Sequence, residues 1–122
     1  MFENSSEETA YHKLLILYIL YKIKMDLTNS QITQVVLETE MMNYFSLQQL
    51  LSQLMESKFL KIYKDSDKEY YCLTQRGLET LESLMLKIPM DSANKVDHYI
   101  KLNKESLLAE TQVKSSFVKQ SE

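Results

Sequence analysis

The stretch FLKIYKDSDKEYYCLTQRG, residues 59–77, decides how this chain folds. Apolar and polar residues alternate in FLKIYK (59–64) and again in EYYCLT (69–74), as in strands that bury one face. The segment DSDK between them is rich in turn-forming residues. The stretch therefore predicts an amphipathic β-hairpin that covers a helical core. Its apolar face carries Leu60, Ile62, Tyr71 and Leu73.

A helix is predicted directly after the hairpin. Thr74 is a suitable N-cap, and the segment TQRGLETLESLMLKI (74–88) repeats apolar residues at helical spacing. Gly77 lies in the first turn, where a side chain would obstruct close packing. Pro89 ends the helix, because the residue before a proline avoids the α conformation.

The segment EETAYHKLLILYILYKIK (7–24) predicts the first helix of the chain. Its apolar residues do not form a single stripe but occupy most of the helix surface. A helix of this kind is buried on more than one side. Either it runs through the core of the domain, or a second subunit covers one of its sides.

Two shorter helices are predicted between the first helix and the hairpin. The earlier one, residues 28–40, begins with a choice of N-caps: Thr28, Asn29 and Ser30. After the linker MMNYF, residues 46–57 carry an apolar stripe at helical spacing. That stripe consists of Leu47, Leu50, Leu51, Leu54 and Met55. This order predicts a tri-helical core that contains a helix-turn-helix.

A fifth helix is predicted from about Ser92 to about Glu110. Its apolar stripe is narrow and is interrupted by Asn103, a pattern that suits pairing with another helix. Together with the apolar surplus on the first helix, this stripe predicts a homodimer. We assign to the dimer interface Leu15, Ile19, Val96, Tyr99, Ile100, Asn103 and Leu107.

Composition limits the class of protein. The 122 residues are 44% hydrophobic, which is enough for one domain with a core. With Cys72 as the only cysteine and two histidines, neither a disulfide framework nor a metal site is expected, and a cytoplasmic location fits. The polar, acidic N-terminus is unlike a secretory signal, and the longest apolar run, residues 14–21, is too short to cross a bilayer. No membrane partner is expected.

The sequence contains no catalytic motif. Glycine-rich phosphate loops, nucleophile elbows, HExxH and Cys-x-x-Cys motifs are all missing. Carboxylates are scattered along helix exteriors rather than paired between apolar residues. We therefore expect a protein that is not an enzyme and that uses no cofactor. No residue pattern marks a pocket for an effector ligand.

Three helices, a hairpin and a further helix follow one another in the order of winged-helix proteins. A string of the form Y-x-L-T-x-x-G-x-x-x-L resembles the second wing strand and the following helix of MarR- and PadR-type bacterial regulators. Its defined positions are Tyr71, Leu73, Thr74, Gly77 and Leu81. Residues 1–110 more closely resemble an uncharacterised winged-helix family of low-GC Gram-positive bacteria, known only as a domain of unknown function.

This resemblance implies a mainly α fold with a small β-hairpin, of the α+β class. We expect a winged helix-turn-helix domain at residues 1–88 and an additional C-terminal helix for dimerisation at residues 89–112. Members of the family continue past the fifth helix into a small β-rich segment. Residues 113–122 are therefore expected to be a tail or the start of that segment.

The resemblance also implies a transcriptional regulator that binds double-stranded DNA, with the third helix in the major groove and residues 63–70 as the wing. Glutamine can read adenine through two hydrogen bonds, and Ser46 with the nearby backbone amides could hold a phosphate. We assign to the recognition helix Ser46, Gln48, Gln49, Ser52 and Gln53. We assign to the wing and its flank Lys58, Lys61, Lys64, Lys68 and Arg76.

Charge favours a second possibility. The formal net charge is −3, and phosphate neutralisation by Lys and Arg supplies most non-specific DNA affinity. The third helix contains no basic residue before Lys58, and the predicted wing carries Asp65, Asp67 and Glu69. The same scaffold could therefore serve as a protein-interaction module that does not bind a specific DNA sequence.

Overall fold

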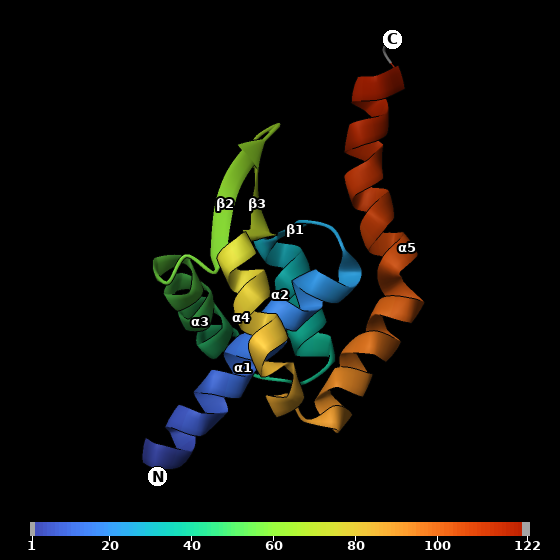
Figure 1. The fold of residues 1–122 in the computed structure, drawn as a ribbon. Coiled ribbons are helices and arrows are strands. Elements are labelled where there is room, and N and C mark those ends of the chain that lie inside the picture. Colours follow the sequence, from blue (N-terminus) through green and yellow to red (C-terminus); the bar gives the residue numbers. More distant parts are fainter. Residues whose placement is uncertain (1, 121–122) are drawn as a thin grey trace.

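The computed structural model describes the backbone of residues 2–120 and the side chains of residues 8–109. The chain is mainly helical, with one small antiparallel sheet (Figure 1). The elements are α1 (Phe2–Ile23), β1 (Leu27–Thr28), α2 (Asn29–Glu38), α3 (Tyr44–Glu56), β2 (Leu60–Asp65), β3 (Lys68–Leu73), α4 (Gln75–Leu84), the 3-10 helix η1 (Met85–Lys87) and α5 (Met90–Gln120). The predicted α+β class and the order of the elements are confirmed.

The hairpin forms as predicted, with a tighter turn. β2 and β3 are paired from Leu60 opposite Leu73 out to Asp65 opposite Lys68. The turn therefore contains only Ser66 and Asp67, whose φ angles of 52° and 71° match the two-residue turns that suit the twist of hairpins. The sheet gains a third strand that the sequence did not predict, because the two residues of β1 are too few to show a period.

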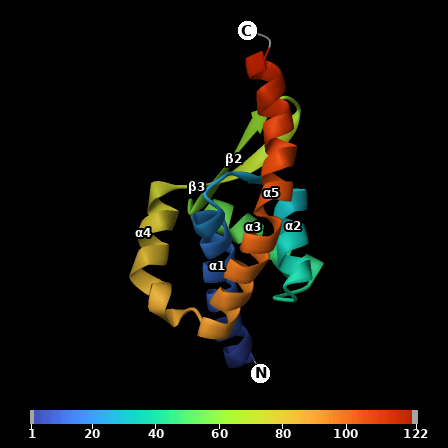
Figure 2. The same ribbon diagram turned by 90° about the vertical axis from the view of Figure 1, so that its right-hand side faces the viewer.

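α1 is the central element of the core. α3, α4, α5 and β3 all pack against it, and Figure 2 shows it between α4 and α5. Residues 14–20, in its C-terminal half, are almost completely buried, and Ile16 and Ile19 have no exposed surface. Of the two explanations for its apolar surface, the structure supports a helix that runs through the core of one chain.

The residues assigned to a homodimer interface lie inside this single chain instead. Leu15 and Ile19 are buried among the elements around α1. The apolar stripe of α5 is buried against α1 and α2, and it consists of Val96, Tyr99, Ile100 and Leu107. Asn103 is half-buried, and its side-chain amide donates a hydrogen bond to the carbonyl oxygen of Tyr99. The apolar surplus is therefore covered without a second subunit.

Polar contacts fix how α5 lies on the core. The Tyr18 hydroxyl of α1 donates to Oδ1 of Asp97 over 2.8 Å, and burial together with this bond raises the pKa of Tyr18 to about 12. Nε2 of Gln34 in α2 donates to the Tyr99 hydroxyl oxygen over 3.2 Å. Contacts with α1 and α2 thus hold α5 in its position.

α5 is longer than predicted at both ends. It begins at Met90 rather than near Ser92 and continues to Gln120, past the body of the molecule (Figure 1). Residues 113–120 are therefore helical and do not begin a strand, and residues 121–122 lie outside the described part. In the part of the chain that the structure describes, no helix combines the length and apolarity needed to cross a membrane.

The helix starts follow from their capping residues. Thr28, one of the three candidates, is the N-cap of α2, because Gln31 completes a capping box with it. α3 begins at Tyr44, two residues before the predicted start, because the side chain of Asn43 accepts a hydrogen bond from the Ser46 amide. Thr74 caps α4 as predicted.

Candidate nucleic-acid interface

The hairpin of β2 and β3 projects from the helical body (Figure 1). β1 pairs with Tyr70 and Tyr71 of β3, and the hairpin continues past β1 to its tip. At the tip, Lys64 stands opposite Glu69 and Asp65 stands opposite Lys68. Each lysine of the tip therefore faces a carboxylate across the ladder, which reduces the positive charge that the tip presents.

The five basic residues assigned to the wing and its flank are all exposed, but they do not gather in one place. Lys64 and Lys68 lie at the tip. Lys58 and Arg76 flank the other end of the hairpin, where Leu60 pairs with Leu73, and Lys61 lies between the two groups. The guanidinium of Arg76 lies 5.6 Å from the centre of the Phe59 ring, so it packs on the hairpin base.

A groove of about 560 Å³ joins the hairpin tip to the first turn of α2. It is lined by Thr28, Asn29, Ser30, Lys64, Asp67, Lys68 and Glu69. The N-terminus of a helix carries a partial positive charge, and the two lysines add to it. The two carboxylates oppose them, so the groove is a mixed-charge surface that lies beside the positive end of α2.

The polar face of α3 is only partly free. Gln49 and Ser52 are exposed and Gln53 is half-exposed, so these three side chains could approach a ligand. Gln48 lies at the contact with α2, where its amide exchanges two hydrogen bonds with the amide of Asn29, over 2.7 and 3.0 Å. The hydrogen-bonding groups of Gln48 therefore join two helices and are not free to contact a base in this structure.

Ser46 does not have the position that the sequence assigned to it. It is the third residue of α3 rather than the first, and its backbone N–H donates to Oδ1 of Asn43 over 2.8 Å. A phosphate would have to displace this cap to reach the Ser46 amide. The Ser46 amide is therefore occupied by the cap, and a role of Ser46 in holding a phosphate stays a prediction.

Two aromatic residues in the first turn of α3 were not predicted as part of a site. Phe45 is 80% exposed and Tyr44 is 48% exposed, and their rings meet edge to face with centres 5.8 Å apart. Both residues belong to the segment MMNYF, which the sequence predicts as a linker rather than as part of the helix. Asn43, three residues before Ser46, was the capping residue that could have placed them on the helix.

Tyr63, Tyr70 and Cys72 lie on the face of the hairpin opposite to its apolar face, and Asp26, just before β1, completes a compact cluster with them. The Tyr63 hydroxyl donates to Oδ2 of Asp26 over 2.6 Å, and this bond, with burial, raises the pKa of Tyr63. The rings of Tyr63 and Tyr70 stack on each other, 5.6 Å apart. Burial, with the nearby Asp26 carboxylate, raises the pKa of the Cys72 thiol and keeps it in its unreactive protonated form.

Comparison with known proteins identifies the family of this chain. Among the described residues, no group of three or more His, Cys, Asp or Glu side chains is arranged to hold a metal ion. Searches of curated proteins and of solved structures found no significant match. Residues 12–122 match a family described as "Domain of unknown function (DUF4364)". Because the match extends over nearly the whole chain, the protein belongs to this DUF4364 family.

Proposed function

We propose that this protein is a winged-helix DNA-binding protein, a transcriptional regulator that acts as a homodimer through a surface other than the buried stripes of α1 and α5. The observation that carries the proposal is the position of the hairpin tip beside the first turn of α2, where Lys64 and Lys68 share a groove with Thr28, Asn29 and Ser30. α2 and α3 form the helix pair that precedes the hairpin. In this arrangement α3 reads bases while the hairpin tip and α2 contact the backbone.

The proposed reading face is smaller than the sequence indicated. It comprises Gln49, Ser52 and Gln53, which are not enclosed by the fold. Glutamine donates to N7 or O6 acceptors and accepts from amino groups, so the two glutamines favour adenine-containing sites. Two copies would place their α3 helices about one helical turn apart on a palindromic site.

Removing the two tip lysines is expected to weaken DNA binding without changing its sequence preference. Log affinity falls with log salt, and the steepness of this fall reflects the number of phosphate contacts. If Lys64 and Lys68 each contact a phosphate, Lys64→Gln with Lys68→Gln should make the slope shallower by about 2. Fluorescence anisotropy across a salt series measures this slope. Lys95→Gln with Lys101→Gln, two exposed lysines of α5, removes the same charge and is the control. An equal loss in both double variants would contradict a specific role for the tip.

Removing the glutamine face is expected to reduce specificity. Gln49→Ala with Gln53→Ala should reduce the preference for the selected site over random DNA by about 1–3 kcal/mol for each lost bidentate contact. Gln48→Ala is the matched control: it should lower the free energy of unfolding by about 1 kcal/mol, since Asn29 loses two of its hydrogen bonds, and leave specificity unchanged. Unchanged discrimination by the double variant would exclude this face as the reader.

The exposed aromatic pair favours a second candidate, a module that binds another protein. Phe45 and Tyr44 present apolar surface, and exposed aromatic side chains are enriched at protein interfaces. Recovery of a stoichiometric protein partner without DNA, at low salt, would favour this module. Loss of that partner in Phe45→Ser would then locate the interface at the start of α3.

A further inference from the structure

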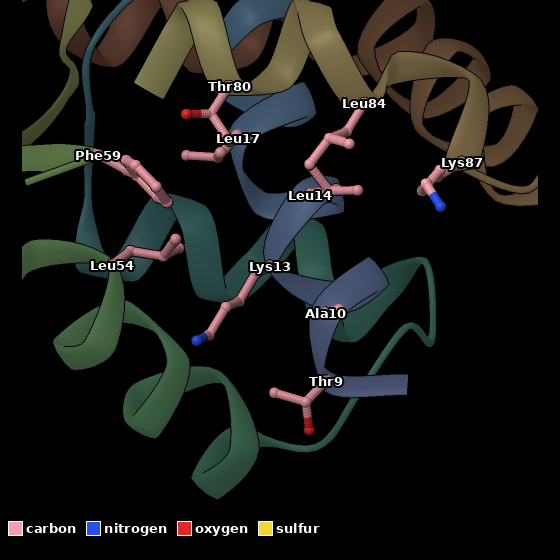
Figure 3. Close-up of a pocket in the computed structure, with 10 residues that line it drawn as sticks. All are labelled: Thr9, Ala10, Lys13, Leu14, Leu17, Leu54, Phe59, Thr80, Leu84 and Lys87. Carbon is pink, nitrogen blue, oxygen red and sulfur yellow. The ribbon is translucent and has the colours of Figure 1, made fainter. Parts of the chain in front are cut away.

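A second and larger groove, about 620 Å³ in volume, lies on a different part of the molecule from the hairpin tip. It is bounded by α1, by α4 with η1, by the last turns of α3 and by the connection to β2 (Figure 3). Its lining residues are Thr9, Ala10, Lys13, Leu14, Leu17, Leu54, Phe59, Thr80, Leu84 and Lys87. Small-molecule sites in proteins commonly have volumes of about 300–1,000 Å³.

The interior of this groove is apolar and belongs to the rigid core. Leu14, Leu17 and Leu54 are nearly fully buried and form its floor. Phe59 and Leu84 are half-buried and provide its walls. Ala10 is exposed, and its small side chain leaves room in the groove where α1 extends away from the body. The groove therefore offers continuous hydrocarbon contact to a slender apolar group.

Both charged residues of the lining are lysines. Lys13 comes from α1 and Lys87 from η1, and their ammonium groups lie on opposite sides of Leu14 and Leu84, at two edges of the groove (Figure 3). The lining also includes the hydroxyl-bearing Thr9 and Thr80, and none of its members among residues 8–109 is a carboxylate. In a chain whose formal charge is −3, this is a locally positive, hydrogen-bonding lining around an apolar floor.

We propose that this groove binds a small amphipathic monocarboxylate, a molecule with one anionic head and a hydrocarbon body. The body contacts the leucines and Phe59, and the carboxylate accepts charge-assisted hydrogen bonds from Lys13 or Lys87. The charge of the lining thus selects an anion over a neutral or cationic ligand of the same size.

The groove lies where α3 meets the hairpin, and these are two parts of the proposed DNA-binding surface. Leu54 lies in the last turns of α3, and Phe59 lies between α3 and β2. A ligand that contacts both residues binds across the junction between α3 and the hairpin. Ligand binding to this groove is measured in the absence of DNA, so that measurement tests the ligand site independently of the proposed DNA-binding function.

Octanoate and 1-octanol are suitable probes, because they share a hydrocarbon chain and differ in charge. Methyl-resolved NMR of the full chain is expected to show saturable octanoate shifts at Leu14, Leu17, Leu54 and Leu84. The methyl groups of Leu102, exposed on α5, should stay unchanged and serve as the internal reference. Octanol should bind more weakly by roughly tenfold, as expected for the loss of a charge-assisted hydrogen bond. Shifts that do not saturate, or that include Leu102 equally, would overturn the proposal.

Two pairs of variants test the apolar and the charged parts separately. Ala10→Leu adds bulk in the groove and should abolish octanoate binding, whereas Ala109→Leu, at an exposed position of α5, should not. Lys13→Gln with Lys87→Gln should reduce octanoate affinity to that of octanol, and Lys95→Gln with Lys101→Gln should leave it intact. Equal affinities for octanoate and octanol in the unmodified protein would refute the anion site. Sedimentation showing a dimer that Ala10→Leu dissociates would also refute it, by assigning the groove to a second copy of the chain.

Discussion

Replacing Gly77 by alanine is expected to lower the free energy of unfolding by at least about 2 kcal/mol, although alanine is the better helix former by about 1 kcal/mol. A Cβ atom at this position would overlap the carbonyl oxygen of Phe59 and would lie 3.0 Å from Cδ1 of Leu73. The overlapped atom belongs to the backbone and cannot move aside by a change of rotamer. The steric term therefore exceeds the gain in helix propensity.

The carbonyl group of Phe59 also takes part in the hydrogen bonds that link the hairpin to α4, so the effect of Gly77→Ala should extend to this junction. The oxygen of Phe59 accepts a hydrogen bond from the backbone N–H of Thr74 over 3.1 Å, and the Thr74 hydroxyl lies between this oxygen, at 3.0 Å, and the carbonyl oxygen of Lys58, at 2.7 Å. Thr74 in turn caps α4 by accepting from the Gly77 N–H over 2.9 Å. Moving Phe59 to admit a methyl group would strain the junction of hairpin and helix.

Urea unfolding followed by circular dichroism measures the effect of Gly77→Ala. Glu82→Ala, an exposed substitution on the same helix, is the control and should change stability by less than about 0.5 kcal/mol. If Gly77→Ala were as stable as the unmodified protein, the gain in helix propensity would outweigh the steric overlap with the carbonyl oxygen of Phe59. The close approach of α4 to Phe59 would then be wrong.

Replacing Ile19 by alanine is expected to destabilise the protein by about 3–4 kcal/mol, because it leaves a cavity in the core. Ile19 has no exposed surface and lies in the C-terminal half of α1, which other elements of the same chain surround. The same change at a subunit interface would act mainly by weakening association. For a residue inside one chain, the loss of stability should be the same at every protein concentration.

Chemical unfolding of Ile19→Ala at concentrations spanning two or more decades distinguishes the two cases. Ile19→Val removes a single methyl group and should destabilise by about 0.5–1.5 kcal/mol, which gives the graded response of a packed core. A loss of stability that grows on dilution would indicate that Ile19 lies at a subunit interface. It would contradict the burial of α1 within one chain.

Local chemistry made much of this fold predictable. The alternation around residues 59–74 determined the hairpin, Thr74 determined the start of α4, and the lack of a side chain at Gly77 indicated a close approach. These features depend on residues near one another in the chain, so their pattern is visible without the fold. The start of α3 was missed for an equally local reason, since the capping role of Asn43 was overlooked.

The sequence by itself determined the α+β class, the order of the elements and the apolar faces to be buried. Only the tertiary structure decided what covers those faces, because an apolar stripe does not specify its partner: α1 and α5 meet within one chain. The same holds for polar side chains, as Gln48 bonds to Asn29, nineteen positions away in the sequence. The large groove arises from α1, α3 and α4 together, so no single segment could reveal it.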